Sequence, residues 1–308
     1  MRFLPALSLL FFTASLCGLA PAAAEKSEKP SPEQIEAAMV ERAHRILGNL
    51  KYKEGTIQLP TGIAHLELPA GYRYLDGSDA RKVVVDYWGN PPDQGSNLLG
   101  LVVPAGEDLA DPNSWAVVIN FEEDGYVSDK DAGKIDYNDL LSQLQENTRE
   151  ANKQRQAQGY EPMELKGWAV PPRYDQEKKV MYWAQDLKVA GEDDTLNYYV
   201  RVLGRRGVLS MNGVAGMDRV KDVEAATPAI VAMTQYNEGH RYADFNSSTD
   251  KKADYTLAGL LLGGLVASKL GLFAKLGTLL LAFKKFVIIG AVAVAGFFKR
   301  LFGRKSQA

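Results

Sequence analysis

Cysteine is almost absent from this 308-residue sequence, and its single example is Cys17. That residue lies inside an apolar N-terminal stretch with the form of a secretory signal, so cleavage would leave a chain without any thiol. A thiol-free chain excludes disulfides, cysteine nucleophiles and cysteine-based zinc sites. Histidine is also scarce, and the three that occur (His44, His65 and His240) show no HExxH spacing.

The common sequence motifs of catalysis and nucleotide binding are missing as well. The sequence contains no P-loop, no GxGxxG and no GxSxG. We therefore predict no cofactor and favour a protein without catalytic activity.

Positive charge is scarce in the middle of the chain and concentrated near its C-terminal end. Residues 25–250 carry 25 basic and 37 acidic side chains, a net charge of −12, whereas residues 251–308 carry ten basic side chains and one acid. An acidic body repels phosphate backbones, which argues against nucleic acid as a partner. The basic tail instead favours contact with anionic lipid.

The N-terminal residues are typical of an exported protein. Arg2 provides a positive start, residues 3–20 are apolar, and three alanines ending at Ala24 are the small residues that a signal peptidase requires. We expect residues 1–24 to be a signal peptide cleaved after Ala24. Residues 25–250 then form an extracytoplasmic domain.

A long apolar segment predicts a membrane anchor within residues 251–308. Residues 256–274 contain one charge, Lys269, and a helix of about 20 residues spans the hydrocarbon layer. Because the domain is exported, one crossing at 256–274 puts the basic tail in the cytoplasm, as the positive-inside rule prefers. We therefore expect a bacterial inner-membrane protein whose main domain faces the periplasm or the cell exterior.

The residues after this span leave two arrangements open. A further apolar stretch, 286–298, either belongs to a basic amphipathic helix on the membrane surface or completes a two-span hairpin, and we favour the single crossing. Gly259 and Gly263 have the spacing that lets two membrane helices pack closely. A homodimer through this segment is therefore a further hypothesis.

Helices and strands follow one another irregularly along the extracytoplasmic part of the chain. Helices are expected at 32–47, 79–88 (where 82–87 also fits a strand), 137–158 and 218–233. Strands are expected at 56–59, 63–68, 98–103, 115–122, 164–169, 180–187, 195–203 and 208–214, with 240–245 as a final strand. Since most strands are joined by hairpins, this pattern predicts an α+β fold: a mostly antiparallel sheet with packed helices, plus the transmembrane helix. The order of elements resembles that of the Mog1/PsbP-like sandwiches.

An acidic loop is the main candidate for metal chemistry. Hard cations such as calcium require several converging carboxylate oxygens. The candidate ligands are Glu122, Glu123, Asp124, Asp129 and Asp131. The loop lacks the glycine and the closing glutamate of an EF-hand, and capping of a short helix explains the same acids. A metal-dependent extracytoplasmic enzyme that uses this loop is therefore the alternative function.

A basic cluster is the second candidate site. Arg201, Arg205 and Arg206 surround the tight hairpin at 204–207 and could hold an anionic ligand. Charged side chains at a solvated turn and strand edge explain the same pattern.

Several long strings resemble a family of bacterial membrane-anchored proteins that share domain of unknown function 2167. They include LPAGYRYL (68–75), DYWGNPP (86–92), REANKQRQAQGYEP (149–162), LNYYVRVLGRRGVL (196–209) and GHRYADF (239–245). The resemblance covers residues 55–305 and implies membrane anchoring, but no activity and no catalytic residues. With the other features it favours a non-catalytic module that is anchored in the bilayer and binds an envelope protein or a small ligand.

Overall fold

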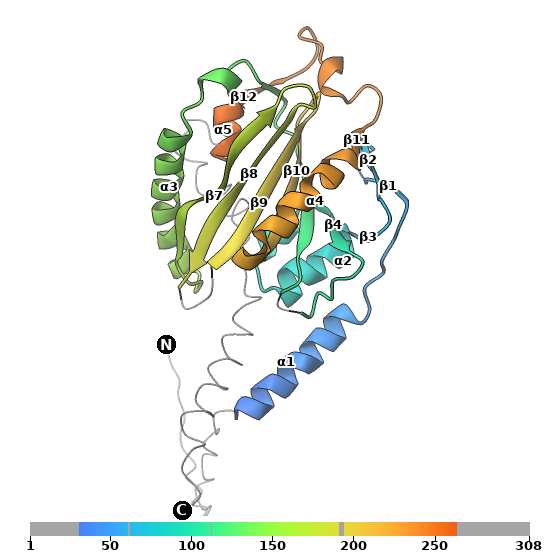
Figure 1. Cartoon of the computed structure of the whole chain (residues 1–308), viewed down its shortest axis with the longest axis vertical. Coiled ribbons are helices and arrows are strands. Elements are labelled where there is room, and N and C mark those ends of the chain that lie inside the picture. The colour runs from blue at the N-terminus through green and yellow to red at the C-terminus, as the bar shows by residue number, and fades with distance from the viewer. Residues whose placement is uncertain (1–30, 61, 112, 191–193, 264–308) are drawn as a thin grey trace, which may run out of the picture. The chain divides into compact units, whose positions relative to one another are not determined.

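The computed structural model describes residues 31–60, 62–111, 113–190 and 194–263 (Figure 1). Its centre is a seven-stranded sheet in the order β3-β4-β5-β10-β9-β8-β7, and every neighbouring pair is antiparallel. The strands are β3 (Tyr72–Asp76), β4 (Leu98–Pro104), β5 (Ala116–Glu122), β7 (Met163–Asp175), β8 (Val180–Val189), β9 (Asp194–Leu203) and β10 (Val208–Gly216). The α+β class and the mostly antiparallel sheet expected from the sequence are confirmed.

Two smaller sheets flank the main one. The first has three antiparallel strands in the order β1-β2-β11, and the second pairs β12 with β6 in parallel. Their strands are β1 (Thr56–Gln58), β2 (Ala64–Glu67), β11 (Thr234–Tyr236), β6 (Tyr126–Ser128) and β12 (Lys252–Thr256). Residues 56–68 thus form the expected hairpin, whereas β3, β6, β11 and β12 are too short or too polar to be evident from the sequence.

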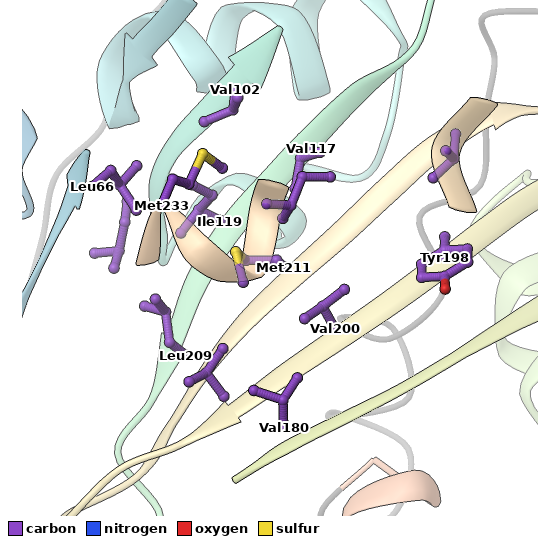
Figure 2. Packing of buried hydrophobic residues seen from close by; sticks show 14 of the residues in the cluster. Leu66, Val102, Val117, Ile119, Val180, Tyr198, Val200, Leu209, Met211 and Met233 are labelled. Carbon is purple, nitrogen blue, oxygen red and sulfur yellow. The ribbon is translucent and has the colours of Figure 1, made fainter. Parts of the chain in front are cut away.

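One face of the main sheet packs against α4 (Val220–Ala232) and the β1-β2-β11 sheet. Side chains at alternate positions of the strands form this core with Leu66 of β2 and with Val223 and Met233 from α4 and its C-terminal end. Figure 2 shows the packing around Val117 and Met211. Helix α4 lies within the helix expected at 218–233, and it continues through Pro228, where the sequence left a kink or a division open.

The opposite face packs against three other helical segments. They are α2 (Gly77–Arg81) with the π-helical η1 (Lys82–Tyr87), α3 (Tyr137–Ala157) and α5 (Leu257–Leu261). Helix α3 begins where the sequence predicts, because the Asp136 carboxylate accepts hydrogen bonds from the backbone N–H groups of Asn138 and Asp139. It ends before Gly159, whose φ of 80° favours glycine.

The remaining helical segments are short, apart from the first. Helix α1 (Pro32–Leu47) packs Ala43, Ile46 and Leu47 against the apolar cluster under α2 and η1. The 3₁₀ segments are η2 (Pro92–Gly95), η3 (Ala132–Lys134), η4 (Met217–Arg219) and η5 (Tyr242–Asp244). The last of these corrects the strand expected at 240–245: the Asp244 carboxylate accepts the backbone N–H of Arg241 and closes a turn.

The domain continues beyond residue 250, where the sequence placed its boundary. Residues 252–256 form β12, and in α5 Leu257, Leu260 and Leu261 are at most 1% exposed. The first residues of the span expected at 256–274 therefore pack on the domain, and 264–274 lie outside the described residues. Among the described residues, no helix has the length and apolar character that a membrane crossing requires.

The packing of the main sheet leaves no room for a side chain at Gly100 in β4. A methyl group at this position would lie 2.2 Å from the ring of Tyr74, whose hydroxyl donates a 2.6 Å hydrogen bond to the Leu99 carbonyl. We expect Gly100→Ala to lower the free energy of unfolding by about 1–3 kcal/mol through overpacking, measured by urea denaturation. Gly133→Ala is the matched control, because nothing lies within 4 Å of the added carbon. Equal stability of both variants would contradict the packing described.

Candidate functional site

Arg201 lies near the C-terminal end of strand β9 and is 1% exposed. Its Nη1 donates to the carbonyls of Val200 (3.2 Å) and Met211 (3.4 Å) and to Oδ1 of Asn212 (2.8 Å). The interpretation of Arg201 as an edge-strand charge in solvent is therefore wrong. Its strand is central in the sheet, and both faces of that sheet are covered.

Two aromatic rings and the carboxylate of Glu122 lie around the guanidinium of Arg201. Its guanidinium carbon lies 5.4 Å from the ring centroid of Trp183 and 5.2 Å from that of Tyr199. Its Nε lies 4.0 Å from Oε1 of Glu122, which accepts a hydrogen bond from Ser210. Burial lowers the pKa of Arg201, and the negative charge of Glu122 opposes that shift.

Three uncharged polar side chains continue this face of the sheet, and we call them the polar row: Gln185, Thr195 and Asn197. Gln185 of β8 and Asn197 of β9 are direct cross-strand partners, and Thr195 is two residues before Asn197. Since side chains two apart in a strand share a face, the row lies on the same side as Arg201. The exposed fractions of its members are 1%, 1% and 0%.

The polar row has hydrogen-bonding groups that the described residues do not satisfy. Oε1 of Gln185, Oγ1 of Thr195 and both Oδ1 and Nδ2 of Asn197 are buried without a partner. A buried polar group left unpaired costs about 1–3 kcal/mol, and native proteins rarely leave several in one place without water or a ligand. The row therefore has unused hydrogen-bond donors and acceptors on a covered face of the sheet.

Helical segments on two sides position this site. Leu261 of α5 and Leu140 of α3 pack with Trp183 and Tyr199, and η1 packs farther along the sheet on Val214 of β10. The local sequence explains the arrangement. In β9, apolar side chains at even positions face α4 and the polar ones at odd positions face α5.

The sequence interpretation missed the polar row. The sequence did contain a signal, because Thr195, Asn197 and Arg201 are two and four residues apart and therefore share one face of a strand. Such alternation normally indicates a strand with one solvent-exposed face. Only the structure shows that α3 and α5 cover that face.

The carboxylates proposed as metal ligands accept hydrogen bonds from different groups of the protein instead of converging on one point. Asp129 accepts hydrogen bonds from Tyr174 (2.8 Å), Tyr242 (3.0 Å) and the ammonium of Lys179 (2.8 Å). Asp124 accepts from Tyr255 at 2.9 Å. Each of these carboxylates therefore has a structural role.

The other acids of the loop have separate roles too. Asp131 accepts from the backbone N–H groups of Leu257 (3.3 Å) and Ala258 (3.1 Å), so it caps α5. Glu122 faces the guanidinium of Arg201, and Glu123 is exposed. Across the described ranges, no three His, Cys, Asp or Glu side chains are arranged to hold a metal ion. The metal hypothesis thus has no assembled site in this part of the chain.

The three arginines of the predicted anion site are not brought together. Arg205 forms a bidentate ion pair with Asp250 (2.7 and 3.0 Å) and donates to the carbonyl of Gly239. Arg206 is exposed, and Arg201 is buried as described. Arg205, Asp129 and Asp131 together fix residues 239–262 on the domain, and we call these three residues the C-terminal clamp.

Gly259 belongs to this clamped segment, and Gly263 follows it directly. Gly259 lies in α5, where an added Cβ would come within 2.6 Å of the Tyr255 side chain. Gly263 follows the helix with a φ of 85°. Their spacing suggested a contact between membrane helices. In the structure Gly259 allows close packing on Tyr255, and Gly263 ends a short helix.

Comparisons with known proteins identify a family and similar folds. A family model described as "Protein of unknown function (DUF2167)" matches residues 51–295, and no curated protein matches the chain. Cyanobacterial PsbP (CyanoP) from Synechocystis sp. PCC 6803 is similar in structure, with a TM-score of 0.33 and 11% identity, covering 61% of this chain and 92% of that one. The Saccharomyces cerevisiae Ran-binding protein Mog1p has a TM-score of 0.32 and 9% identity, covering 61% and 96%. Both likenesses concern the fold alone.

Asp129 predicts a pH dependence of stability. Desolvation raises the pKa of its carboxyl, but hydrogen bonds from Lys179, Tyr174 and Tyr242 outweigh this and lower the pKa below its usual range. The stability that this group contributes is present above an unfolded-state pKa of about 3.9 and is lost as pH falls through the lower folded-state pKa. We expect Asp129→Asn to lower the free energy of unfolding by about 2 kcal/mol at neutral pH.

The same variant should lose less stability on acidification than the wild type, so that the two converge near pH 2, roughly two units below the unfolded pKa. Thermal melting at pH values between about 6 and 2 measures this difference. Exposed Glu161→Gln is the control and should follow the wild type. Parallel curves for Asp129→Asn and wild type would contradict the assignment.

Proposed function

The chain belongs to the DUF2167 family of proteins of unknown function, and we propose that its domain is a non-catalytic ligand-binding module. The polar row is the binding site. The observation that carries this proposal is the unused hydrogen-bonding capacity of Gln185, Thr195 and Asn197 on a covered sheet face.

The chemistry of the row indicates the class of ligand. Amide and hydroxyl groups both donate and accept hydrogen bonds and carry no formal charge. The charge of Arg201 is four residues from Asn197, about 13 Å along the strand. The ligand is therefore a small neutral molecule rich in hydroxyl or amide groups, such as a sugar or polyol.

Binding rather than catalysis follows from the same side chains. Gln185, Thr195 and Asn197 have no titratable group that could transfer a proton near neutral pH. What they provide is a fixed pattern of donors and acceptors on a rigid sheet. This pattern supports recognition.

We further propose that the module is exported and held on the inner membrane of a bacterium. A signal peptide cleaved after Ala24 supports export. Since Leu257–Leu261 pack on the domain, the anchoring residues follow Gly263, in the apolar and lysine-bearing segment 264–308. The domain then faces the periplasm and the basic tail the cytoplasm.

A matched pair of substitutions tests whether the row is built for a ligand. Thr195→Val removes a buried hydroxyl without a partner, so we expect a gain of about 1 kcal/mol in the free energy of unfolding. Thr148→Val is the control, because the equally buried Thr148 hydroxyl donates to the Leu144 carbonyl at 2.8 Å. It should bring no gain. Urea denaturation of the purified protein measures both, and a loss of stability in Thr195→Val would contradict the unpaired state of this group.

Ligand-dependent melting tests binding itself. Glucose, N-acetylglucosamine and glycerol are the probes, and a probe that binds only the folded protein at about 100 times its Kd adds about 2.7 kcal/mol of stability. We expect at least one probe to raise the melting temperature of the wild type and to leave that of Asn197→Leu unchanged. If every probe acts equally on both proteins, the proposed site is wrong.

Protease treatment of spheroplasts tests the location. We expect added protease to degrade the domain and to leave the basic tail protected, while fractionation recovers the intact chain with membranes. Asp129→Asn and wild type should behave alike in this assay, since the clamp does not set topology. Recovery of the full chain as soluble material, protected from protease, would contradict the proposed anchoring.

A further inference from the structure

A cleft of about 220 Å³ lies between α4 and the ends of β7 and β8, on the face of the sheet opposite to the polar row. Helix α4 lies across β9 and β10 (Figure 1), so its edge forms one wall. The floor is formed by Val180, Tyr182 and Tyr198, and the wall of α4 by Pro228 and Val231. This surface is apolar apart from the two phenols.

Two opposite charges, those of Arg173 and Glu224, lie on the rim. Among the described residues, the side chains of Arg173 and Glu224 form no hydrogen bond and no ion pair with another residue, and both are exposed. Lys178 and Asp175, also at the rim, pair with each other at 3.8 Å. Arg173 and Glu224 are therefore free to meet charges of a ligand.

Both charges line the cleft and act on the same phenol of its floor. Burial raises the pKa of Tyr198, the hydrogen bond with Thr227 lowers it, Glu224 raises it and Arg173 lowers it. A ligand near the Tyr198 hydroxyl would thus lie within the fields of a carboxylate and a guanidinium.

Pro228 adds a backbone acceptor to the wall. In an α-helix the N–H of residue 228 would donate to the carbonyl of Glu224, but proline has no N–H. The Glu224 carbonyl therefore lacks its helical hydrogen bond. This oxygen and the Glu224 carboxylate are suited to an ammonium group.

We propose that this cleft binds a free α-amino acid with an apolar side chain. Arg173 receives the carboxylate, Glu224 receives the ammonium group, and the side chain lies on Val180 and Val231. The size agrees, because the volume equals the liquid share of roughly seven water molecules at about 30 Å³ each. That is room for one amino acid. The site is independent of the polar row.

The probes are leucine, leucinamide and N-acetylleucine, titrated into the full-length protein in detergent micelles and followed by calorimetry. Leucinamide lacks the carboxylate and N-acetylleucine lacks the ammonium charge. We expect leucine to bind with a Kd on the order of 1 mM and each analogue to bind about tenfold more weakly.

Two variants assign each charge to its residue. In Arg173→Gln, leucine and leucinamide should bind equally, and in Glu224→Gln, leucine and N-acetylleucine should bind equally. Arg206→Gln and Glu177→Gln change exposed residues outside the cleft and should keep the wild-type order.

Asn197→Leu should also keep leucine binding, which separates this proposal from that of the polar row. Absence of leucine binding in the wild type overturns the proposal. Equal affinity of the wild type for all three probes does so too, and so does an unchanged order in both cleft variants.

Discussion

Strand β9 is buried on both of its faces, and most of the structure follows from this constraint. Residues 195–203 are all buried, with the even-numbered side chains toward α4 and the odd-numbered ones on the opposite face. A polar side chain on a covered face must find hydrogen bonds inside the protein or lose those it made with water. Arg201 finds carbonyls, an amide and two aromatic rings. Asn197 lies four residues before Arg201 on the same face. Its side chain has no hydrogen-bond partner among the described residues.

Much of the fold could be predicted because it depends on local signals. The alternation in β8, β9 and β10, the cap at Asp136 and the apolar stripe of α3 act over a few residues each. Short elements escaped, since three residues of β6 or β11 contain too little pattern to separate from loop. Their pairing depends on contacts between residues far apart in the chain, which no local pattern encodes.

The candidate sites show that local patterns also predict the partners of a side chain poorly. Acidic side chains near Asp129 suggested a cation, but Tyr174 of β7, Tyr242 of η5 and Lys179 of the β7–β8 turn occupy that carboxylate. Leu257–Leu261 suggested lipid, because a helix that packs in a core and one that lies in a bilayer can have the same composition. In both cases the residue types were interpreted correctly, and the partner was decided by the tertiary structure.

The C-terminal clamp has a mechanical consequence. Strand β12 pairs in parallel with β6, the Asp131 carboxylate holds the first turn of α5, and Arg205 grips Asp250 with two hydrogen bonds. A pull on the chain beyond Gly263 therefore reaches these contacts first. The hydrogen bonds of the clamp and the buried cluster around Leu257 and Leu260 would resist the pull together, and this cluster includes Leu203 of β9. Because Leu261 also packs on Tyr199, tension applied on the C-terminal side of the domain would be transmitted directly to a central strand of the sheet.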